Sequence, residues 1–538
     1  MRKYHSLLPV LLGFAVLNSF VGCVEDIEEK ERYSSSTVGL LKLLKVEEKF
    51  TDNLLNQKNF RYLSSVGYEL HRSLNEKVQY VSNPINAFSL LRRTHEDLPK
   101  WHEYFKEAIG EGNQSILVDL VKMVPNDVDM LSAMHGIQRI EKIYDLKIDD
   151  LAQGVLQGVQ YNVQLTYRDL IAMGNSMYQQ SDYQTAAKWY RIACKRELEN
   201  PEQLFIQILG DPSEHLHRQY IKSLFKYGST TSEPSKSIEE AFIMVQASQE
   251  ELDNIMSDLN EPQNDVEVEK DLYQVKRSPS NCELGCRGLY RQKTNLVCRY
   301  KSTANTFLRL APLKLEEISL DPFMAMYHEV LYDSEIRELK GQSMNMVNGY
   351  ASQRNGTEIR DTVVRYDWWS NTSLVRERIN QRIIDMTGFN FLKDEKLQIA
   401  NYGLGTYFQP HFDYSSDGFE TPNITTLGDR LASILFYASE VPQGGATVFP
   451  EINVTVFPQK GSMLYWFNLH DDGKPDIRSL HSVCPVLNGD RWSRLAYSYI
   501  RTIVLHIGSF LLQRSQSGFL CFRKCLASHA NRSKYNSS

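Results

Sequence analysis

One small polar cluster, set among apolar runs of β type, constrains the fold of this chain more than any other feature. His411 and Asp413 are two residues apart, so on an extended strand both side chains point to the same face. Far downstream, His481 supplies a third candidate ligand. Two histidines and one carboxylate form a facial set that leaves open positions on an iron ion. The pattern predicts a non-haem Fe(II) oxygenase site, with His470 as the alternative third ligand.

The residues around this cluster decide how it is interpreted. A lone His-x-Asp pair is more often a pair of polar surface residues on a strand. Here, however, residues 429–437, 444–450 and 461–468 are β-rich apolar runs separated by Gly and Pro turns. That pattern is typical of an antiparallel sandwich or jelly roll. The chain is therefore expected to carry the cluster inside such a fold.

Length, charge and the N-terminus limit the class of protein. A chain of 538 residues exceeds a single core and predicts two to four domains. A net charge of -6 gives no basic field, so nucleic-acid binding is disfavoured. Arg2 and Lys3 precede an apolar stretch, Leu7 to Val21, which predicts a cleavable signal at 1–23 and no membrane span. A buried N-terminal helix and a lipoprotein-type anchor are the alternatives.

The order of motifs resembles the animal collagen prolyl 4-hydroxylase α subunits, from about residue 34 to about residue 492. The motifs lie at 398–403, 410–413, 444–450 and 481–486. The resemblance implies that His411, Asp413 and His481 hold Fe(II), with 2-oxoglutarate as co-substrate, ascorbate as a cofactor and proline-rich or collagen-like peptides as substrate. It also implies a protein disulfide isomerase β subunit as partner in an α2β2 tetramer in the lumen of the endoplasmic reticulum. No retention signal ends the chain, so that partner would hold it there.

The expected fold class is α+β with several domains. An all-α N-terminal region and a tetratricopeptide-like (TPR-like) peptide-binding domain precede a double-stranded β-helix, or jelly roll, that forms the catalytic domain. The predicted division is a signal at 1–23, a helical dimerisation region at 24–150, the peptide-binding domain at 151–258, a linker at 259–281, the dioxygenase at 282–500 and a divergent tail at 501–538. The linker assignment depends on low hydrophobicity and turn-forming residues.

Residues 165–197 predict a helical hairpin. Large residues on its first helix face small alanines on its second, which is typical of TPR packing. Four aromatic residues are candidates for stacking on an extended proline-rich peptide: Tyr178, Tyr183, Trp189 and Tyr227. For any one of them, a place in the core is the competing interpretation. A second hairpin near 215–250 lacks the tyrosines that the family has there, which leaves peptide preference open.

The cysteines and glycosylation sequons suit a lumenal protein. The resemblance implies a disulfide between Cys286 and Cys298, and a partner for Cys484 near the C-terminus, at Cys521 or Cys525. A zinc site at Cys282 and Cys286 lacks a second pair of ligands. Seven Asn-x-Ser/Thr sequons occur, at Asn113, Asn355, Asn371, Asn423, Asn453, Asn531 and Asn536.

A cation must hold the distal carboxylate of 2-oxoglutarate. The family has lysine at this place, whereas counting from His481 arrives here at Arg491. A guanidinium can bind a carboxylate through two parallel hydrogen bonds, with Tyr402 as a second donor, but its shape differs from that of an ammonium. The leading hypothesis is a 2-oxoglutarate-dependent dioxygenase of the procollagen-proline 4-dioxygenase type. The alternatives are a non-catalytic peptide-binding subunit and an oxygenase for another secreted proline-rich protein.

Overall fold

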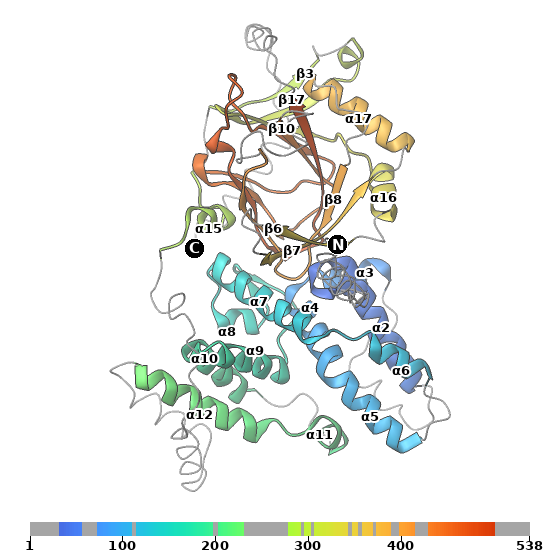
Figure 1. The fold of residues 1–538 in the computed structure, drawn as a ribbon, viewed down its shortest axis with the longest axis vertical. Coiled ribbons are helices and arrows are strands. Elements are labelled where there is room, and N and C mark those ends of the chain that lie inside the picture. Colours follow the sequence, from blue (N-terminus) through green and yellow to red (C-terminus); the bar gives the residue numbers. More distant parts are fainter. Residues whose placement is uncertain are drawn as a thin grey trace, which may run out of the picture.

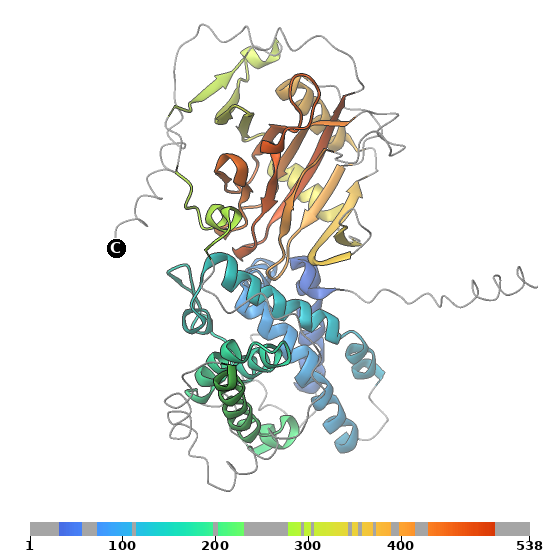
Figure 2. The same ribbon diagram turned by 60° about the vertical axis from the view of Figure 1, so that its left-hand side comes forward.

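The structure is a computed structural model, and it describes twelve stretches of the chain: 32–55, 73–109, 115–196, 203–230, 278–291, 295–302, 306–342, 347–352, 358–369, 373–388, 397–414 and 429–500. Helices occupy the described residues up to 230, here called the helical half. Strands dominate from 278 onward, here called the strand half. The two halves lie end to end and stay distinct when the molecule is turned (Figures 1 and 2).

The helical half is built from amphipathic helices of moderate length. Its described elements, with two short strands and two irregular turns, are η1 (Tyr33–Ser35), α2 (Thr37–Leu55), α3 (Leu74–Val81), α4 (Pro84–Arg92), the π-helical η3 (Arg93–Asp97), α5 (Leu98–Ile109), α6 (Ser115–Lys122), α7 (Asp127–Tyr144), α8 (Ile148–Ala152), β1 (Val155–Leu156), β2 (Val159–Gln160), α9 (Tyr167–Gln179), α10 (Tyr183–Cys194), α11 (Gln203–Leu209) and α12 (Ser213–Thr230).

The α9–α10 hairpin forms as the sequence predicts. Thr166 and Asp169 make a capping box that starts α9, which satisfies backbone donors that the first turn would leave without partners. The two helices then pack closely, because a Cβ on Gly174 would meet the ring of Tyr190 at 2.4 Å. Helix α12 packs against α10 through buried residues of the same core, among them Leu216 and Tyr220. The packing is consistent with a TPR-like arrangement.

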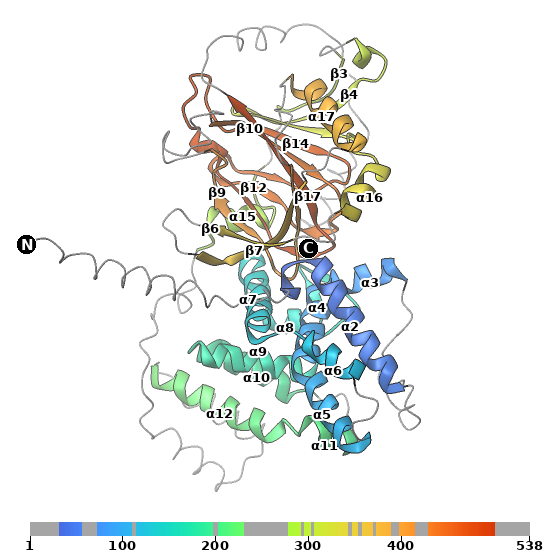
Figure 3. The ribbon, with the colours of Figure 1, turned by 45° about the vertical axis from the view of Figure 1, so that its right-hand side comes forward.

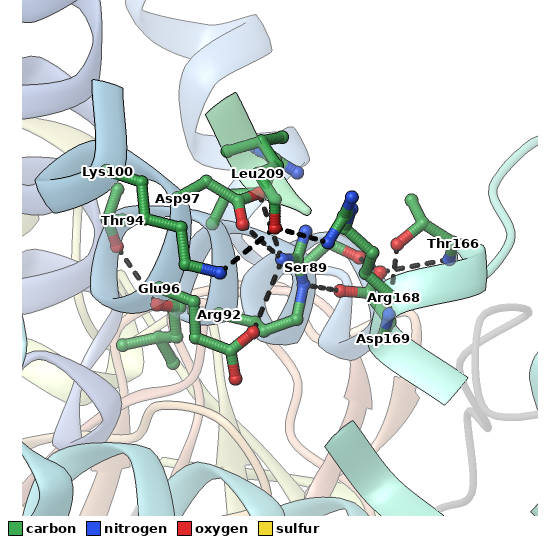
Figure 4. Close-up of polar contacts among 12 residues, drawn as sticks. Ser89, Arg92, Thr94, Glu96, Asp97, Lys100, Thr166, Arg168, Asp169 and Leu209 are labelled. Carbon is green, nitrogen blue, oxygen red and sulfur yellow. Dashed lines mark hydrogen bonds and ion pairs between the residues drawn. The ribbon is translucent and has the colours of Figure 1, made fainter. Parts of the chain in front are cut away.

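A buried ion cluster joins this hairpin to the helices before it (Figure 4). Arg92, at the end of α4, donates to Asp169 of α9 at 2.6 Å and to Asp97 at 2.9 Å. Arg92 is 2% exposed and Asp169 is fully buried, so each charge depends on the other. Beside this cluster, Lys100 and Arg168 both donate to the carbonyl oxygen of Leu209 at the end of α11. Ion pairs and hydrogen bonds, as well as apolar packing, thus connect the helices of the helical half.

The strand half begins with α15 (Asn281–Cys286). Its other elements are β3 (Cys298–Lys301), η5 (Phe307–Arg309), β4 (Leu313–Leu320), β5 (Phe323–His328), α16 (Asp333–Gln342), β6 (Val347–Ser352), β7 (Glu358–Trp369), α17 (Leu374–Thr387), β8 (Leu397–Asn401), β9 (Phe408–His411), β10 (Asp429–Tyr437), β11 (Gln443–Gly444), β12 (Thr447–Phe449), η7 (Pro450–Ile452), β13 (Val454–Val456), β14 (Met463–Phe467), η8 (Ile477–Ser479), β15 (His481–Val483), β16 (Val486–Asn488) and β17 (Trp492–Ile500).

Two antiparallel sheets form the body of this half. Among the described residues, nine strands make the larger sheet in the order β3-β4-β5-β14-β10-β17-β8-β7-β6, and β13-β12-β15-β9 make the smaller one. A core cluster containing Leu435, Phe449 and Trp466 packs between them. Helices α16 and α17 bury Ile336 and Ile379 against the large sheet (Figure 3). This two-sheet arrangement matches the predicted jelly roll.

The structure contradicts the predicted disulfide between Cys286 and Cys298. Cys286 ends α15, which packs on β12 and β13, and its sulfur bonds instead to Cys484, with a Cα–Cα distance of 5.6 Å. Cys484 follows β15 directly, whereas Cys298 begins β3 at the edge of the large sheet. The prediction of a C-terminal partner for Cys484 is therefore wrong as well.

Several predictions fall outside the described residues: the signal at 1–23, most of the linker, the tail at 501–538 and every sequon except Asn453. Across the described stretches, none of the helices combines the length and apolar character needed to cross a bilayer.

Candidate iron and co-substrate site

Strands β9 and β15 bring the predicted iron ligands together. They pair antiparallel with His411 and His481 as register partners, so the two imidazoles lie side by side with ring centroids 4.2 Å apart. Asp413 follows β9 two residues later, and its carboxylate oxygens lie 3.7 Å and 3.6 Å from Nε2 of the two histidines. One ligand atom from each residue lies within 4.8 Å of the others. Among the described residues, this is the one group of acidic, His and Cys side chains arranged for a metal.

Hydrogen bonds orient each of these side chains. Nδ1 of His411 lies 2.8 Å from the carbonyl oxygen of Gln409, and Nδ1 of His481 lies 3.0 Å from that of Ser479. Each Nδ1 can donate to its carbonyl, and this leaves a lone pair on Nε2 toward the centre. Neither contact was apparent in the sequence.

The Asp413 carboxylate has an outer partner of its own. The hydroxyl of Ser433, on β10, donates to Asp413 at 2.5 Å and accepts from Asn468 at 2.9 Å. Such partners fix the direction of a ligating carboxylate and tune a metal site. Ser433 and Asn468 are site residues that the sequence reasoning missed. The available signal was the serine at 433 among the apolar residues 431–436.

The electrostatics favour the charge states that a metal needs. Burial lowers the pKa of His411 to about 3, so its imidazole is neutral at ordinary pH. Burial alone would raise the pKa of Asp413, but the neighbouring His481 and His411 hold it below its usual value. The rings of Phe449 and Trp466 lie against the ring of His481, with centroid distances of 5.6 Å and 4.9 Å. Two imidazoles and one carboxylate, with aromatic rings packed against His481, fit a divalent iron ion.

Arg491 lies in the same half, directly before β17, and it is fully buried. Its Nε donates to the carbonyl oxygen of Gly445 at 3.0 Å, and one terminal nitrogen lies 3.4 Å from the hydroxyl oxygen of Thr447. The other terminal nitrogen has no hydrogen-bond partner within the described part of the chain. A buried cation with an unpaired donor is costly, and an anionic ligand would remove that cost. Arg491 therefore fits the distal carboxylate of 2-oxoglutarate.

Tyr402 and Tyr437 border this guanidinium. The Arg491 guanidinium carbon lies 4.4 Å from the ring centroid of Tyr402 and 5.9 Å from that of Tyr437. The hydroxyl of Tyr437 is 2.9 Å from that of Thr447, which pairs with Val483 on the strand that begins at His481. Thr447, which lies beside Arg491, thus belongs to the same sheet as the two histidines. Tyr437 and Thr447 were not predicted, although Thr447 lies within the Gly-Gly-Ala-Thr motif.

Three of the four predicted peptide-binding residues share one region of the helical half. Tyr178 and Tyr183 are half-buried, and their rings meet edge to face at 5.2 Å. Tyr227 of α12 accepts a hydrogen bond from Gln184, the neighbour of Tyr183. Trp189 is different, because it is fully buried in the core and has no surface to offer a peptide. The prediction for Trp189 is wrong, and its place in the core was the competing interpretation.

The alternatives for metal binding are not supported. His470 is 46% exposed and lies 3.6 Å from Asp476, away from the three-residue group. Cys282 is a free thiol that joins no metal-binding group of described residues.

Comparison with known proteins agrees with this geometry. Residues 36–158 match the N-terminal region of the prolyl 4-hydroxylase α subunit, and residues 397–499 match the 2OG-Fe(II) oxygenase superfamily. The chain is 30% identical over 450 residues to prolyl 4-hydroxylase subunit alpha-2 of Caenorhabditis elegans, covering 77% of this chain and 80% of that protein. The chain belongs to the prolyl 4-hydroxylase α subunit family. Human prolyl 4-hydroxylase subunit alpha-1 is 29% identical over 439 residues, with 77% and 82% covered.

Solved structures similar to part of this family member include a viral collagen prolyl hydroxylase from Paramecium Bursaria Chlorella virus-1 in complex with 2OG. The match has 21% identity and a TM-score of 0.27, and it covers 33% of this chain and 96% of that one. A Pseudomonas putida prolyl-4-hydroxylase matches with 17% identity and a TM-score of 0.22 over 39% of this chain and 97% of that one.

Proposed function

We propose that this chain is a catalytic prolyl 4-hydroxylase α subunit that hydroxylates proline in collagen-like or other proline-rich peptides of the secretory pathway, using Fe(II), 2-oxoglutarate and O₂. The observation that carries the proposal is the convergence of His411, Asp413 and His481 within 4.8 Å. Family membership supports it, because relatives covered over about four fifths of their length are named prolyl 4-hydroxylase α subunits.

In this mechanism His411, Asp413 and His481 would hold the iron. Bound there, iron supplies the oxidation chemistry that couples decarboxylation of 2-oxoglutarate by O₂ to hydroxylation of a proline C–H bond. The chain's own residues position the reagents. Carbonyl oxygens of Gln409 and Ser479 keep the two imidazoles in the ligating tautomer.

Arg491 is proposed to hold the distal carboxylate of 2-oxoglutarate, with Tyr402 as a second donor beside it. The unpaired terminal nitrogen of the guanidinium supports this role. Charge-assisted hydrogen bonds of this kind contribute about 1.5–3 kcal/mol each. The aromatic rings of Phe449 and Trp466 exclude water from one side of the site.

The remaining features of the enzyme are proposals of the same kind. Ascorbate would keep the iron ferrous, and a protein disulfide isomerase β subunit would join the chain in an α2β2 assembly in the lumen of the endoplasmic reticulum. Tyr178, Tyr183 and Tyr227 would contact the peptide. The domain division given above is retained, with the jelly roll at 282–500 as the catalytic domain.

The deciding experiment is co-expression with protein disulfide isomerase, followed by measurement of 2-oxoglutarate turnover and hydroxyproline on a panel of proline-rich peptides. The proposal expects peptide-dependent turnover that disappears in the His481→Ala complex. A correctly assembled complex that binds peptides but consumes no 2-oxoglutarate would support the non-catalytic subunit instead. Turnover with proline-rich peptides that are not collagen-like would reassign the substrate while keeping the chemistry.

A further inference from the structure

The helical half contacts the strand half at the segment that carries Tyr402. This segment, residues 402–407, joins β8 to β9 and is here called the 402–407 loop. The amide of Leu404 donates to the carbonyl oxygen of Ser34 at 3.0 Å. A Cβ on Gly403 would lie 2.2 Å from that same oxygen, so only glycine permits this approach. Backbone therefore packs directly on backbone between residues that are hundreds of positions apart.

A buried strap, Tyr33–Val38, makes this contact, and helix α7 holds the strap in place. The carboxylate of Asp129, on α7, accepts hydrogen bonds from the amides of Tyr33 and Ser34 at 2.9 and 3.0 Å, and from the Ser34 hydroxyl at 2.6 Å. Asp129 is itself fully buried. Three donors to one buried carboxylate fix the strap more firmly than apolar packing alone would.

The far end of the strap contacts the two residues that directly precede Tyr402 and Arg491 in the sequence. The Thr37 hydroxyl lies 2.9 Å from Oδ1 of Asn401 and 2.5 Å from Oδ1 of Asp490. Asn401 in turn donates to Asp490 at 2.9 Å. Asn401 directly precedes Tyr402, and Asp490 directly precedes Arg491. The Thr37 hydroxyl thus contacts the side chains of both preceding residues. The backbones of Tyr402 and Arg491 are also bonded directly, from the amide of Tyr402 to the carbonyl oxygen of Arg491 at 3.1 Å.

Helix α7 contacts the same region at three further places, and it lies at the strand-facing side of the helical half (Figures 1 and 3). A Cβ on Gly136 would lie 2.6 Å from the carbonyl oxygen of Leu404. Arg139 donates to the carbonyl oxygen of Gly405 at 2.5 Å. The Tyr144 hydroxyl donates to the carbonyl oxygen of Pro485 at 2.5 Å. The amide of Gly445 donates to the same oxygen, and the carbonyl oxygen of Gly445 accepts from Arg491.

From these contacts we infer that the strap and α7 form the back wall of the co-substrate pocket, and that Thr37 and Gly136 are positioning residues for Tyr402 and Arg491. The inference rests on the proposed role of those two residues toward 2-oxoglutarate. The physical reason is geometric: a guanidinium binds a carboxylate well only in a narrow range of positions, and small displacements are costly. The N-terminal helical region then serves the catalytic site directly, in addition to any role in assembly.

The first test removes the Thr37 hydroxyl without changing the shape of the side chain. Thr37→Val should raise the KM for 2-oxoglutarate about three- to tenfold, the range expected for loss of one buried hydrogen bond. The kcat and the KM for peptide should change less than about twofold, because the metal ligands and the peptide region are untouched. Thr37→Ser keeps the hydroxyl and should retain the wild-type KM. Measurements use the full chain in its complex.

The second test adds a side-chain atom that collides with the 402–407 loop. Gly136→Ala places a methyl group against the Leu404 carbonyl, and it should both raise the KM for 2-oxoglutarate and speed amide hydrogen exchange of Leu404 by about tenfold or more. The matched control is Gly341→Ala on α16, where an added Cβ meets nothing within 4 Å. That control should alter neither measurement.

The outcomes separate this inference from the proposed function. Unchanged Leu404 exchange in Gly136→Ala, or a lower melting temperature in Thr37→Val with an unchanged KM for 2-oxoglutarate, would overturn the back wall as a positioning device. A wild-type complex that does not bind 2-oxoglutarate would overturn the proposed function and with it the role of the wall in catalysis. Faster exchange in Gly136→Ala would then support only the contact itself.

Discussion

Arg92 in the helical half and Arg491 in the strand half are both almost completely buried, but their surroundings differ. Arg92 has the carboxylates of Asp169 and Asp97 within 2.9 Å of its nitrogens (Figure 4). Arg491 contacts a carbonyl oxygen and a hydroxyl oxygen, and one of its nitrogens has no partner within the described residues.

The difference is the one expected between a buried charge that stabilises the fold and a buried charge that is proposed to bind a ligand. A buried charge is tolerated when opposite charges and hydrogen bonds offset its desolvation. At Arg92 the fold itself provides that offset, and the two carboxylates raise the pKa of the guanidinium although burial alone would lower it. At Arg491 the fold leaves the offset incomplete, so a bound carboxylate is expected to complete it. The same contrast holds between Asp169, which has its arginine, and Asp413, which faces two histidines and is prepared for a cation.

The largest expected effect concerns Asp413. Asp413→Ala should reduce hydroxylation by more than about 100-fold, because a direct ligand should cost more than the 10- to 100-fold typical of an outer partner. Ser433→Ala, which removes such an outer partner, should fall within that range. Peptide binding by the helical half should persist in both. Hydroxyproline formation at saturating iron measures the effect. Full activity in Asp413→Ala would contradict the role of Asp413 as a metal ligand, and with it the difference drawn between Asp413 and Asp169.

Arg92→Ala should lower the free energy of unfolding by about 3–5 kcal/mol, since it leaves Asp169 buried without its cation. Lys122→Ala is the control, because its pair with Asp119 is 70% and 68% exposed and should contribute less than about 1 kcal/mol. Urea unfolding provides both values. Where Arg92→Ala still folds, its KM for 2-oxoglutarate should match wild type. A stability loss no greater than that of the control would mean that the buried cluster does not stabilise the fold.

Arg491→Met should act in the opposite direction on stability. Replacing an incompletely paired buried cation by an apolar side chain of similar length should leave the unliganded protein as stable as before, or more stable by about 1 kcal/mol or more. The KM for 2-oxoglutarate should rise about 10- to 100-fold, the cost of losing a charge-assisted contact. Arg491→Lys should be milder. A KM equal to wild type in Arg491→Met would remove Arg491 from the pocket.

How far the sequence predicts these sites depends on whether the information is local. Strand periodicity led to the pairing of His411 with Asp413, although β9 ends at His411 and Asp413 lies two residues beyond it. The surrounding apolar runs identify the fold that brings His481 to them. The α9–α10 hairpin is equally local, with a capping box and small-against-large packing within thirty residues. These predictions need no knowledge of how distant segments meet.

The parts that were wrong or missed depend on distant contacts or on the direction of a side chain. Cys286 pairs with Cys484 at a sequence separation of 198 residues, and cysteine spacing alone does not select between such partners. Helical periodicity marks Trp189 as apolar without deciding whether its face meets the core or a peptide. The contact from Thr37 to Asn401 spans 364 positions and leaves no pattern in either segment.

The smallest expected effect concerns Glu141 on α7, a carboxylate with a weaker cationic environment than either Asp169 or Asp413. Burial raises its pKa to about 7, which Lys188 only partly counteracts. The folded protein therefore binds a proton more tightly than the unfolded chain, whose glutamate titrates at about 4.3. The contribution of Glu141 to the free energy of unfolding is therefore fully present below about pH 4.3. It decreases as the pH rises to about 7 and does not change further at higher pH.

Glu141→Gln keeps the shape of the side chain and removes the charge. At pH 8 the variant should be more stable than wild type, on the order of 1 kcal/mol after allowance for partial exposure, and at pH 4 the two should agree. Asp119→Asn, at an exposed carboxylate, should show no such pH-dependent gain. Unfolding curves across this pH range measure the difference. A stability difference between variant and wild type that is the same at every pH would instead indicate an effect on packing. The charge of Glu141 would then not be comparable with those of Asp169 and Asp413.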